Sequence, residues 1–452
     1  MTHLAIALGL AGALAALPHQ DDGPDGRPPI ELREGDRIVL LGDALIERMQ
    51  DFGDLEAILT AAHPDQTITF RNLGWSGDTV FGEARAGFGT PEDGFKELVA
   101  QVEAAAPSLL IVGYGANESW AGEQGLPRFR EGYGRLLDAL EATGAREIVL
   151  LSPIAQRGPN PLDPFGELPH NRDIQRYAEA IGQISRERGH RFIDLFTAMT
   201  NRPTRSLADI KDGTPPPMIP LSVSYSDDGI HLDEPGQESL ARWLSDRLFG
   251  AVSGAPHARI TVGEQIAIEA THGSIADVTL IPGGIRFQFK RTSLPDREPA
   301  LGSMAQGTIR VDGLPEGLYR VSCDGEPLRA GHGTIPPPFD DRLGDHGDSG
   351  ATRVGITVVP GSFPVEIAPD REQFEALRRA IIAKNRLYFH RYRPQNSTYL
   401  FGFRKHEQGN NAVEVEQFER LVAEAEAEIA RLKVPAPHEY QLVRIAEEDD
   451  DR

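Results

Sequence analysis

The segment Arg37-Ile-Val-Leu-Leu41-Gly42-Asp43-Ala44-Leu45 decides the fold. A short apolar run that contains β-branched residues and stops at a glycine predicts a buried strand over residues 37–41. The chain then carries apolar residues at helical spacing from Leu45 to Ala62. A buried strand followed directly by an amphipathic helix is the repeating unit of a parallel α/β sheet.

The same alternation continues to about Gly250. We expect strands at 37–41, 67–70, 109–113, 147–151 and 191–195, and helices at 45–62, 93–105, 126–143 and 173–188. The pattern predicts a three-layer α/β/α domain over residues 36–250, with a five-stranded parallel sheet and right-handed crossovers. Ligands of such sheets bind at the carboxyl ends of the strands.

After residue 250 the pattern changes twice. Short alternating runs between Gly and Pro turns predict a small β-rich domain, an antiparallel sandwich, over residues 256–365. Residues 366–436 predict a helical hairpin whose first helix begins at a capping box of Asp370 and Gln373, and whose second runs from about 416 to 433. We expect the hairpin to pack on the main body, with oligomerisation through its apolar stripe as the alternative. Residues 437–452 are expected to form an acidic tail.

The N-terminus predicts export. Residues 1–18 have the apolar run and the small-x-small ending, Ala13-Leu14-Ala15, of a signal peptide, although the charged start is weak, and 19–35 would be a linker. The run is too short for membrane insertion. We therefore expect a periplasmic or extracellular protein; a buried helix or a misassigned start codon is the alternative.

Composition excludes several classes of partner and cofactor. A net charge of −22 over 452 residues opposes binding to nucleic acid or to an anionic membrane surface. The single cysteine, Cys323, excludes an internal disulfide and a thiolate metal cluster. The acidic stretch 340–350 is expected to be a solvated charge cluster in preference to a calcium site. No metal or organic cofactor is expected.

Four separated blocks follow the predicted strands or stand near the end of the domain. They are Gly42-Asp43-Ala44, Asn72-Leu-Gly74-Trp-Ser76-Gly-Asp-Thr79, Gly115-Ala-Asn117-Glu118 and Asp228-Gly-Ile-His231. In this order and spacing they resemble the SGNH hydrolases, also called the GDSL esterase and lipase family, over residues 36–249.

The resemblance implies an ester hydrolase and a role for each block. His231 would be the general base and Asp228 would orient it. The oxyanion would accept hydrogen bonds from the backbone N–H of Gly74, the side-chain amide of Asn117 and the backbone N–H of Ala44. The expected substrate is a small-molecule or carbohydrate ester, most plausibly an O-acyl group on a carbohydrate.

The sequence departs from the family at the nucleophile, because Ala44 stands where the family has serine. Glu118 also replaces the usual aspartate. Ser76, Thr79, Asp43 or a water activated by His231 are alternative nucleophiles, and a serine-to-alanine change introduced at position 44 would also explain the sequence. A catalytically silent module that binds acylated glycans is the alternative function, and a structural scaffold has no positive signal.

Two further groups are candidates for binding substrate. Trp75, Tyr114 and Trp120 could form an apolar wall, with His170 and the loop 158–169 at its rim, although core packing explains such aromatics equally well. Near the C-terminus, Arg391, Arg393, Arg404 and Lys405 could contact a polar carbohydrate. The alternative is that these cations pair with acidic neighbours and hold the hairpin on the domain.

Overall fold

The computed structural model describes residues 27–158, 165, 168–200, 225–226, 228–250, 255–295, 307–328, 356–359, 361–365, 368–407 and 412–445. The expected signal peptide, the acidic stretch 340–350 and most of the loop 158–169 lie outside these residues.

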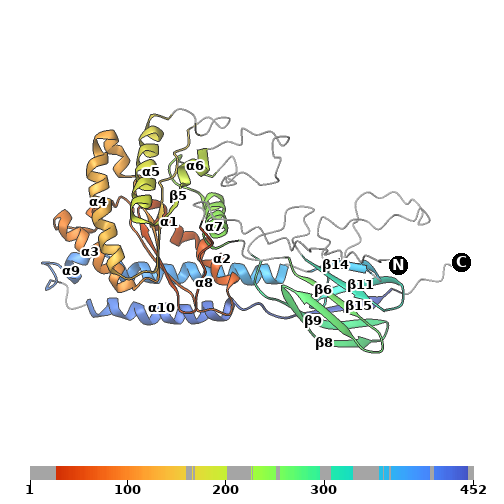
Figure 1. Cartoon of the computed structure of the whole chain (residues 1–452). Coiled ribbons are helices and arrows are strands. Elements are labelled where there is room, and N and C mark those ends of the chain that lie inside the picture. Colours follow the sequence, from red (N-terminus) through yellow and green to blue (C-terminus); the bar gives the residue numbers. More distant parts are fainter. Residues whose placement is uncertain are drawn as a thin grey trace, which may run out of the picture.

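The expected three-layer α/β/α fold is confirmed in the first half of the chain, which we call the α/β body (Figure 1). Its sheet has five parallel strands in the order β2-β1-β3-β4-β5. In chain order its elements are β1 (Arg37–Gly42), α1 (Ala44–Phe52), α2 (Asp54–Ala62), β2 (Thr69–Gly74), η1 (Glu83–Arg85), α3 (Pro91–Ala105), β3 (Leu109–Gly113), η2 (Glu118–Ala121), α4 (Gly122–Ala142), β4 (Glu147–Leu151), α5 (Pro169–Arg188), β5 (Arg191–Ile193), α6 (Leu195–Thr200) and α7 (Glu234–Phe249).

Alternate residues of β1 show how the two faces are covered. Val39 and Leu41 are buried in one apolar cluster with α3 and α4. Ile38 and Leu40 point to the other face, where they are buried with α1, α2 and α7. Because both faces are covered, the strand is apolar throughout its middle, as the sequence indicates.

The segment predicted as one helix over 45–62 is two helices separated by Gly53. Gly53 has a φ of 68° and ends α1 in the left-handed conformation, with its N–H bonded to the carbonyl of Met49. This conformation favours glycine and reverses the chain between the two helices.

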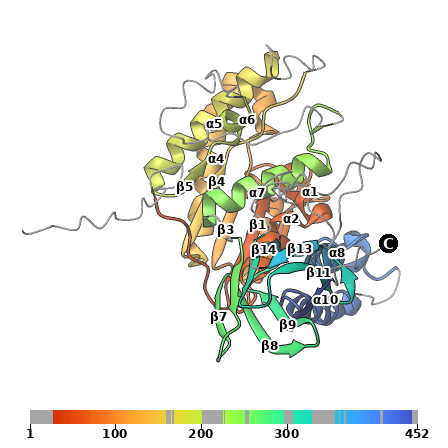
Figure 2. The same cartoon turned by 90° about the vertical axis from the view of Figure 1, so that its right-hand side faces the viewer.

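The β domain has two sheets that enclose one apolar cluster (Figures 1 and 2). The first has the order β14-β10-β6-β7; the second has the order β12-β11-β15-β9-β8, with β13 also paired to β11. The elements are β6 (His257–Thr261), β7 (Ala267–Thr271), β8 (Gly273–Ile281), β9 (Gly284–Arg291), β10 (Thr308–Asp312), β11 (Gly317–Cys323), β12 (Glu326–Pro327), β13 (Ile356–Val359), β14 (Gly361–Pro364) and β15 (His438–Arg444). The pairing is mostly antiparallel, with β6 and β10 parallel.

Part of the expected acidic tail is wrong, because residues 438–444 form strand β15. This strand lies between β9 and β11 and pairs antiparallel with both. Tyr440 and Leu442 alternate with polar residues and are fully buried in the β domain. The alternation of apolar and polar residues in 438–444 is typical of a half-buried strand, but the acidic residues that follow it led to the expectation of a tail.

The hairpin consists of α8 (Ala368–Tyr392) and α10 (Ala412–Leu432), with the short helix α9 (Ser397–Leu400) between them. Figure 1 shows the two long helices side by side along the α/β body. Helix α8 packs against β2, the edge strand of the sheet, and α10 reaches this strand through the ion pair of Glu426 with Arg71. The ammonium of Lys384 is buried there, 2.8 Å from both carboxylate oxygens of Glu56 and 3.1 Å from the carbonyl oxygen of Phe70.

The predicted capping box at the start of α8 is not formed. The helix begins at Ala368, and Asp370 instead accepts a hydrogen bond of 2.8 Å from the buried guanidinium of Arg291 in β9. The side chain of Gln373 donates to the carbonyls of Leu432 and Val434. The side chains of Asp370 and Gln373 therefore bond to distant segments instead of to the start of α8, and Asp370 does so because a buried guanidinium requires an anionic partner.

Within the described residues, no helix combines the length and the apolar character needed to cross a membrane.

Candidate functional site

Helix α1 begins at the carboxyl end of β1 and presents a free backbone donor. Asp43 is its N-cap residue and accepts a hydrogen bond from the N–H of Leu45. The N–H of Ala44 has no acceptor among the described residues, as expected for the first residue of a helix. The partly exposed start of α1 therefore offers an N–H group and the positive end of the helix dipole.

The carboxyl group of Asp43 is buried beneath this start. Burial raises its pKa to about 7, and hydrogen bonds from the backbone of Leu45 and Ala116 act in the opposite direction. Asp43 is already engaged as a cap and is enclosed, so it is badly placed to attack a substrate.

Asp228 and His231 form a hydrogen-bonded pair in the turn before α7. One oxygen of Asp228 accepts from the backbone N–H of Ile230 and His231, both at 2.8 Å, and the other lies 2.6 Å from Nδ1 of His231. These hydrogen bonds, first the one from the His231 backbone, hold the pKa of Asp228 well below its usual range. Asp228 is thus ionised and fixes Nδ1 of His231 as the protonated nitrogen, which leaves Nε2 as a base.

The turn that carries His231 lies on the same side of the sheet as α1, although 188 positions (231 − 43) separate His231 from Asp43 in the chain. Leu232, the residue after His231, is buried in one apolar cluster with Ile46 of α1 and with Leu240 of α7. The turn is held in place from the segment that follows β4: the N–H of Arg157 donates to the carbonyl of Gly229 at 2.7 Å. The structure thus brings together the first and last of the four sequence blocks.

The prediction that Gly74 donates to an oxyanion is wrong. Gly74 is the last residue of β2, and its N–H donates to the side-chain oxygen of Asn72 at 2.8 Å. Its position is set by close packing instead, because a Cβ there would lie 2.1 Å from the backbone nitrogen of Glu47. Asn72 and Gly74 therefore join β2 to α1.

Gly77 is the glycine of this block that has a free donor. It lies in the turn 75–78, whose middle residues are exposed and which the N–H of Asp78 closes by donating to the carbonyl of Trp75 at 2.9 Å. Gly77 has a φ of 80° and open space around it, and its N–H has no acceptor within the part of the chain that the structure describes. We call residues 75–78 the oxyanion turn, after the role that the sequence leads us to expect for this block. The Ser76-Gly77-Asp78 sequence, typical of a glycine turn, was the signal that could have identified this donor.

Asn117 is held against the oxyanion turn. One N–H of its side-chain amide donates to the carbonyl of Asp78 at 2.7 Å, which leaves the second N–H for a ligand. The neighbouring Glu118 accepts from the N–H of Val80 at 2.9 Å and of Gly115 at 3.0 Å. Burial raises the pKa of Glu118 to about 7. Glu118 thus serves to join the second and third blocks.

The alternative hydroxyl nucleophiles are differently placed. The hydroxyl of Thr79 donates to Glu83 at 2.9 Å and accepts from the N–H of Phe81, so it is engaged in its own turn. Ser76 is exposed, and its backbone N–H donates to the carboxylate of Glu47.

The three candidate aromatic residues have different surroundings. Tyr114 is fully buried, with its hydroxyl 3.1 Å from Asp78, so it belongs to the core and not to a ligand wall. Trp75 packs against Tyr392 and Arg393 of α8 and its continuation. Trp120 is 67% exposed and stacks on the ring of His170 with a centroid distance of 3.6 Å. Of the three, Trp120 offers the open aromatic face.

The C-terminal cations are largely paired within the protein. Arg404 pairs with Glu407 and lies over the ring of Tyr399, and Lys405 is exposed. Arg391 lies 3.1 Å from Glu419. A groove of about 860 Å³ lies between α3 and the hairpin; Trp75 and Arg393 line it, whereas His231, Asn117 and Gly77 do not.

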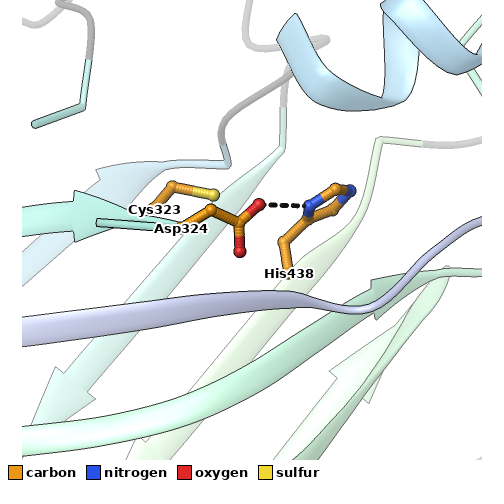
Figure 3. Close-up of side chains that lie close together, drawn as sticks. All are labelled: Cys323, Asp324 and His438. Carbon is orange, nitrogen blue, oxygen red and sulfur yellow. Dashed lines mark hydrogen bonds and ion pairs between the residues drawn. The ribbon is translucent and has the colours of Figure 1, made fainter. Parts of the chain in front are cut away.

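One group in the described residues has side chains of the kinds that bind metals close together: Cys323, Asp324 and His438 (Figure 3). Nδ1 of His438 lies 2.7 Å from Asp324, and Nε2 lies 3.3 Å from Asp370. Hydrogen bonds to these carboxylates, first that of Asp370, raise the pKa of His438 to about 9. Both imidazole nitrogens of His438 thus face carboxylates, and the cluster forms a junction between the β domain and α8.

Comparison with known proteins supports the resemblance at the level of one domain. Residues 40–239 match the sequence profile of a family described as GDSL-like Lipase/Acylhydrolase. The comparison with curated proteins gives no match.

Similar solved structures include BT4096, described as a gut microbial diltiazem-metabolizing enzyme, with a TM-score of 0.58 and 16% identity over 92% of this chain and 99% of that chain. A mutant of Axe2, an acetylxylan esterase from Geobacillus stearothermophilus, has a TM-score of 0.35 and 19% identity over 48% of this chain and 96% of that chain. The likeness to BT4096 extends beyond the α/β body, so the fold of almost the whole chain is similar to that of another protein.

Proposed function

We propose that the protein hydrolyses an ester, an O-acyl group on a carbohydrate, because residues 40–239 match the profile of the GDSL-like Lipase/Acylhydrolase family. The observation that carries this proposal is the hydrogen bond of 2.6 Å between Asp228 and Nδ1 of His231, in a turn that packs in the same apolar cluster as α1. In the proposed site, Nε2 of His231 is the general base and the unoccupied hydrogen-bond donors bind the oxyanion.

Three donors are available for the charge that develops on the carbonyl oxygen. They are the N–H groups of Ala44 and Gly77 and the free amide N–H of Asn117. Donors that are already oriented cost no reorganisation during the reaction, and each contributes on the order of 3 kcal/mol to transition-state stabilisation.

Water is the nucleophile in the proposed reaction, because Ala44 carries only a methyl group. Nε2 of His231 accepts a proton from water while the water oxygen bonds to the acyl carbon. The tetrahedral oxyanion then collapses, the ester C–O bond breaks, and the imidazolium returns the proton to the leaving alcohol. The products are a carboxylic acid and the free hydroxyl of the carrier. Without a covalent nucleophile the rate is expected to be low, about 10³ to 10⁴-fold above water.

A carbohydrate carrier is proposed from the surroundings of Asn117. Trp120, three residues away, exposes a flat ring that His170 supports from one side by stacking. A rigid exposed aromatic face is suited to the apolar face of a sugar ring. The strongly negative chain also favours a neutral carrier over an anionic one.

A catalytically silent module that binds acylated glycans is the second candidate. The absence of an attacking atom at Ala44 favours it. The donors and the aromatic face would then bind the ester without cleaving it.

One set of assays separates the two functions. Hydrolysis of aryl acetates and acetylated oligosaccharides is measured for the parent chain, Ala44→Ser, His231→Ala and the double variant. Activity of the parent that disappears with His231→Ala supports water-based catalysis. Activity that appears only with Ala44→Ser, together with parent binding of acetylated oligosaccharide, supports the silent module. If no version hydrolyses or binds these esters, both proposals are wrong.

We also propose export, on the N-terminal pattern described above. Expression of the full chain followed by N-terminal sequencing of the secreted or periplasmic product tests it: a start near residue 19 is expected, and retention of Met1 in a cytoplasmic product contradicts it.

A further inference from the structure

The middle of the oxyanion turn has little packing of its own, whereas Asp78 at its end is fully buried and ion-paired with Arg85. Gly77 and Ser76 are exposed, and no atom would contact a Cβ on Gly77 within 4 Å. A backbone donor is effective only when its direction is fixed, so the orientation of the Gly77 N–H depends on contacts made by the neighbouring residues of the turn.

One contact comes from the last residue of α8. The hydroxyl of Tyr392 donates to the carbonyl of Gly74 at 2.7 Å, in a buried environment. Its ring meets Trp75 edge-to-face at 6.4 Å between centroids. Tyr392 therefore holds both the residue before the oxyanion turn and the first residue in it.

A second contact comes from the next residue, Arg393. Its guanidinium lies 3.9 Å from the centroid of Trp75, and its Nη1 lies 3.2 Å from a carboxylate oxygen of Glu47. The same oxygen of Glu47 accepts the backbone N–H of Ser76. Because Glu47 is in the first turn of α1, this network joins the hairpin, the oxyanion turn and the helix that presents the Ala44 N–H.

The turn also orients the side-chain amide of Asn117, because the carbonyl of Asp78 accepts a hydrogen bond from it. Displacement of the turn would therefore affect Gly77 and Asn117 together.

We propose that Tyr392 and Arg393 are positioning residues that fix the oxyanion turn against the start of α1. The hairpin then helps to position the donors of the site and also packs against the edge strand β2. The catalytic consequence rests on the proposed function, whereas the mechanical coupling does not.

The coupling is tested without catalysis by amide hydrogen exchange in the full chain. Tyr392→Phe removes only the hydroxyl bonded to Gly74. Arg393→Gln removes the positive charge that pairs with the carboxylate of Glu47. Tyr388→Phe is the matched control, because Tyr388 lies one turn earlier on α8 and its ring contacts Arg71 and Tyr392 instead of the oxyanion turn. The change removes one hydroxyl and keeps these ring contacts.

We expect about tenfold faster exchange of the hydrogen-bonded amides of Trp75, Ser76 and Asp78 in the two test variants, which corresponds to about 1.4 kcal/mol of local opening free energy. Exchange in β3 (Leu109–Gly113) and in the control is expected to stay unchanged. Unchanged exchange of these three amides overturns the proposal, and so does an equal increase in the control.

The catalytic consequence is measured in whichever version, parent or Ala44→Ser, hydrolyses an ester. Tyr392→Phe and Arg393→Gln should lower kcat about tenfold and leave KM and the pH profile unchanged, since the donors act in the transition state and His231 is untouched. A merely structural role would lower thermal stability and leave kcat unchanged at temperatures where the variants are folded. Inactivity of every version is a failure of the proposed function alone, because the exchange experiment still decides the coupling.

Discussion

Breaking the buried pair of Glu56 and Lys384 should strongly destabilise the docking of the hairpin. Glu56 lies in α2 and Lys384 in α8, and the ammonium is fully buried with three oxygen atoms around it. Glu56→Leu leaves this ammonium with the carbonyl of Phe70 as its remaining acceptor in the described structure.

The expected loss follows from the desolvation of the charge that remains. Removal of one partner of a buried ion pair costs about 3–5 kcal/mol, a large part of an unfolding free energy of about 5–15 kcal/mol. The double variant Glu56→Leu/Lys384→Met removes both charges and retains the side-chain lengths approximately. It should be within about 1 kcal/mol of the parent, because apolar replacements of a buried pair are often neutral or stabilising.

Urea unfolding followed by tryptophan fluorescence measures these differences. All three tryptophans, Trp75, Trp120 and Trp243, lie in the α/β body, so the signal reports on the domain against which α8 packs. Arg420→Gln, which removes an exposed pair with Glu424 on α10, is the control and should change the unfolding free energy by less than about 0.5 kcal/mol.

The reasoning is refuted if Glu56→Leu costs no more than the control. It is refuted equally if the double variant is as unstable as Glu56→Leu, since the loss would then come from packing and not from an unpaired charge.

Three further outcomes are expected. Gly77→Ala should fold, with a loss of about 1–2 kcal/mol of unfolding free energy because the residue has a φ of 80°. Gly74→Ala should fail to accumulate as folded protein, because the added Cβ would lie 2.1 Å from the α1 backbone. Equal expression levels and equal melting temperatures of the two variants would contradict this. In a hydrolytically active version, Asn117→Ala should lower kcat about 10²-fold to 10³-fold with little change in KM, and a change confined to KM would remove Asn117 from the oxyanion site. The pKa of His438 is raised to about 9 from an ordinary value of 6.5, so its ion pairs contribute full stability below about pH 6.5, and this contribution is lost as pH rises through 9. The melting temperature should therefore fall over that pH range in the parent but not in His438→Gln. Parallel curves of melting temperature against pH for the two proteins would contradict the assignment.

Local patterns predicted the α/β body because each of its strands is a short run buried on both faces. Residues 37–41 and 109–113 show this clearly, whereas the strand order came from the structure. The break at Gly53 was missed because the apolar spacing continues through it, and only the positive φ reveals the change of direction.

The site was predictable to the level of its blocks but not of each atom. The spacing of Asp228 and His231 predicts their pairing, since three residues in a tight turn bring the two side chains together. The choice between Gly74 and Gly77 depends on which N–H is already satisfied, and the acceptor for Gly74 is a side chain, Asn72, whose direction the spacing does not indicate.

By itself, the amino-acid sequence determined the period of each element, the residue types in the four blocks, and the lack of a hydroxyl at position 44. These are local properties, because hydrophobic periodicity and side-chain chemistry do not depend on distant neighbours. Tertiary structure alone decided that β15 completes the β domain, that Asp370 pairs with Arg291 instead of capping α8, and that Tyr392 bonds to Gly74, 318 positions away. Each of these is a contact between segments far apart in the chain, where burial makes an unsatisfied polar group costly and so selects partners that no local pattern identifies.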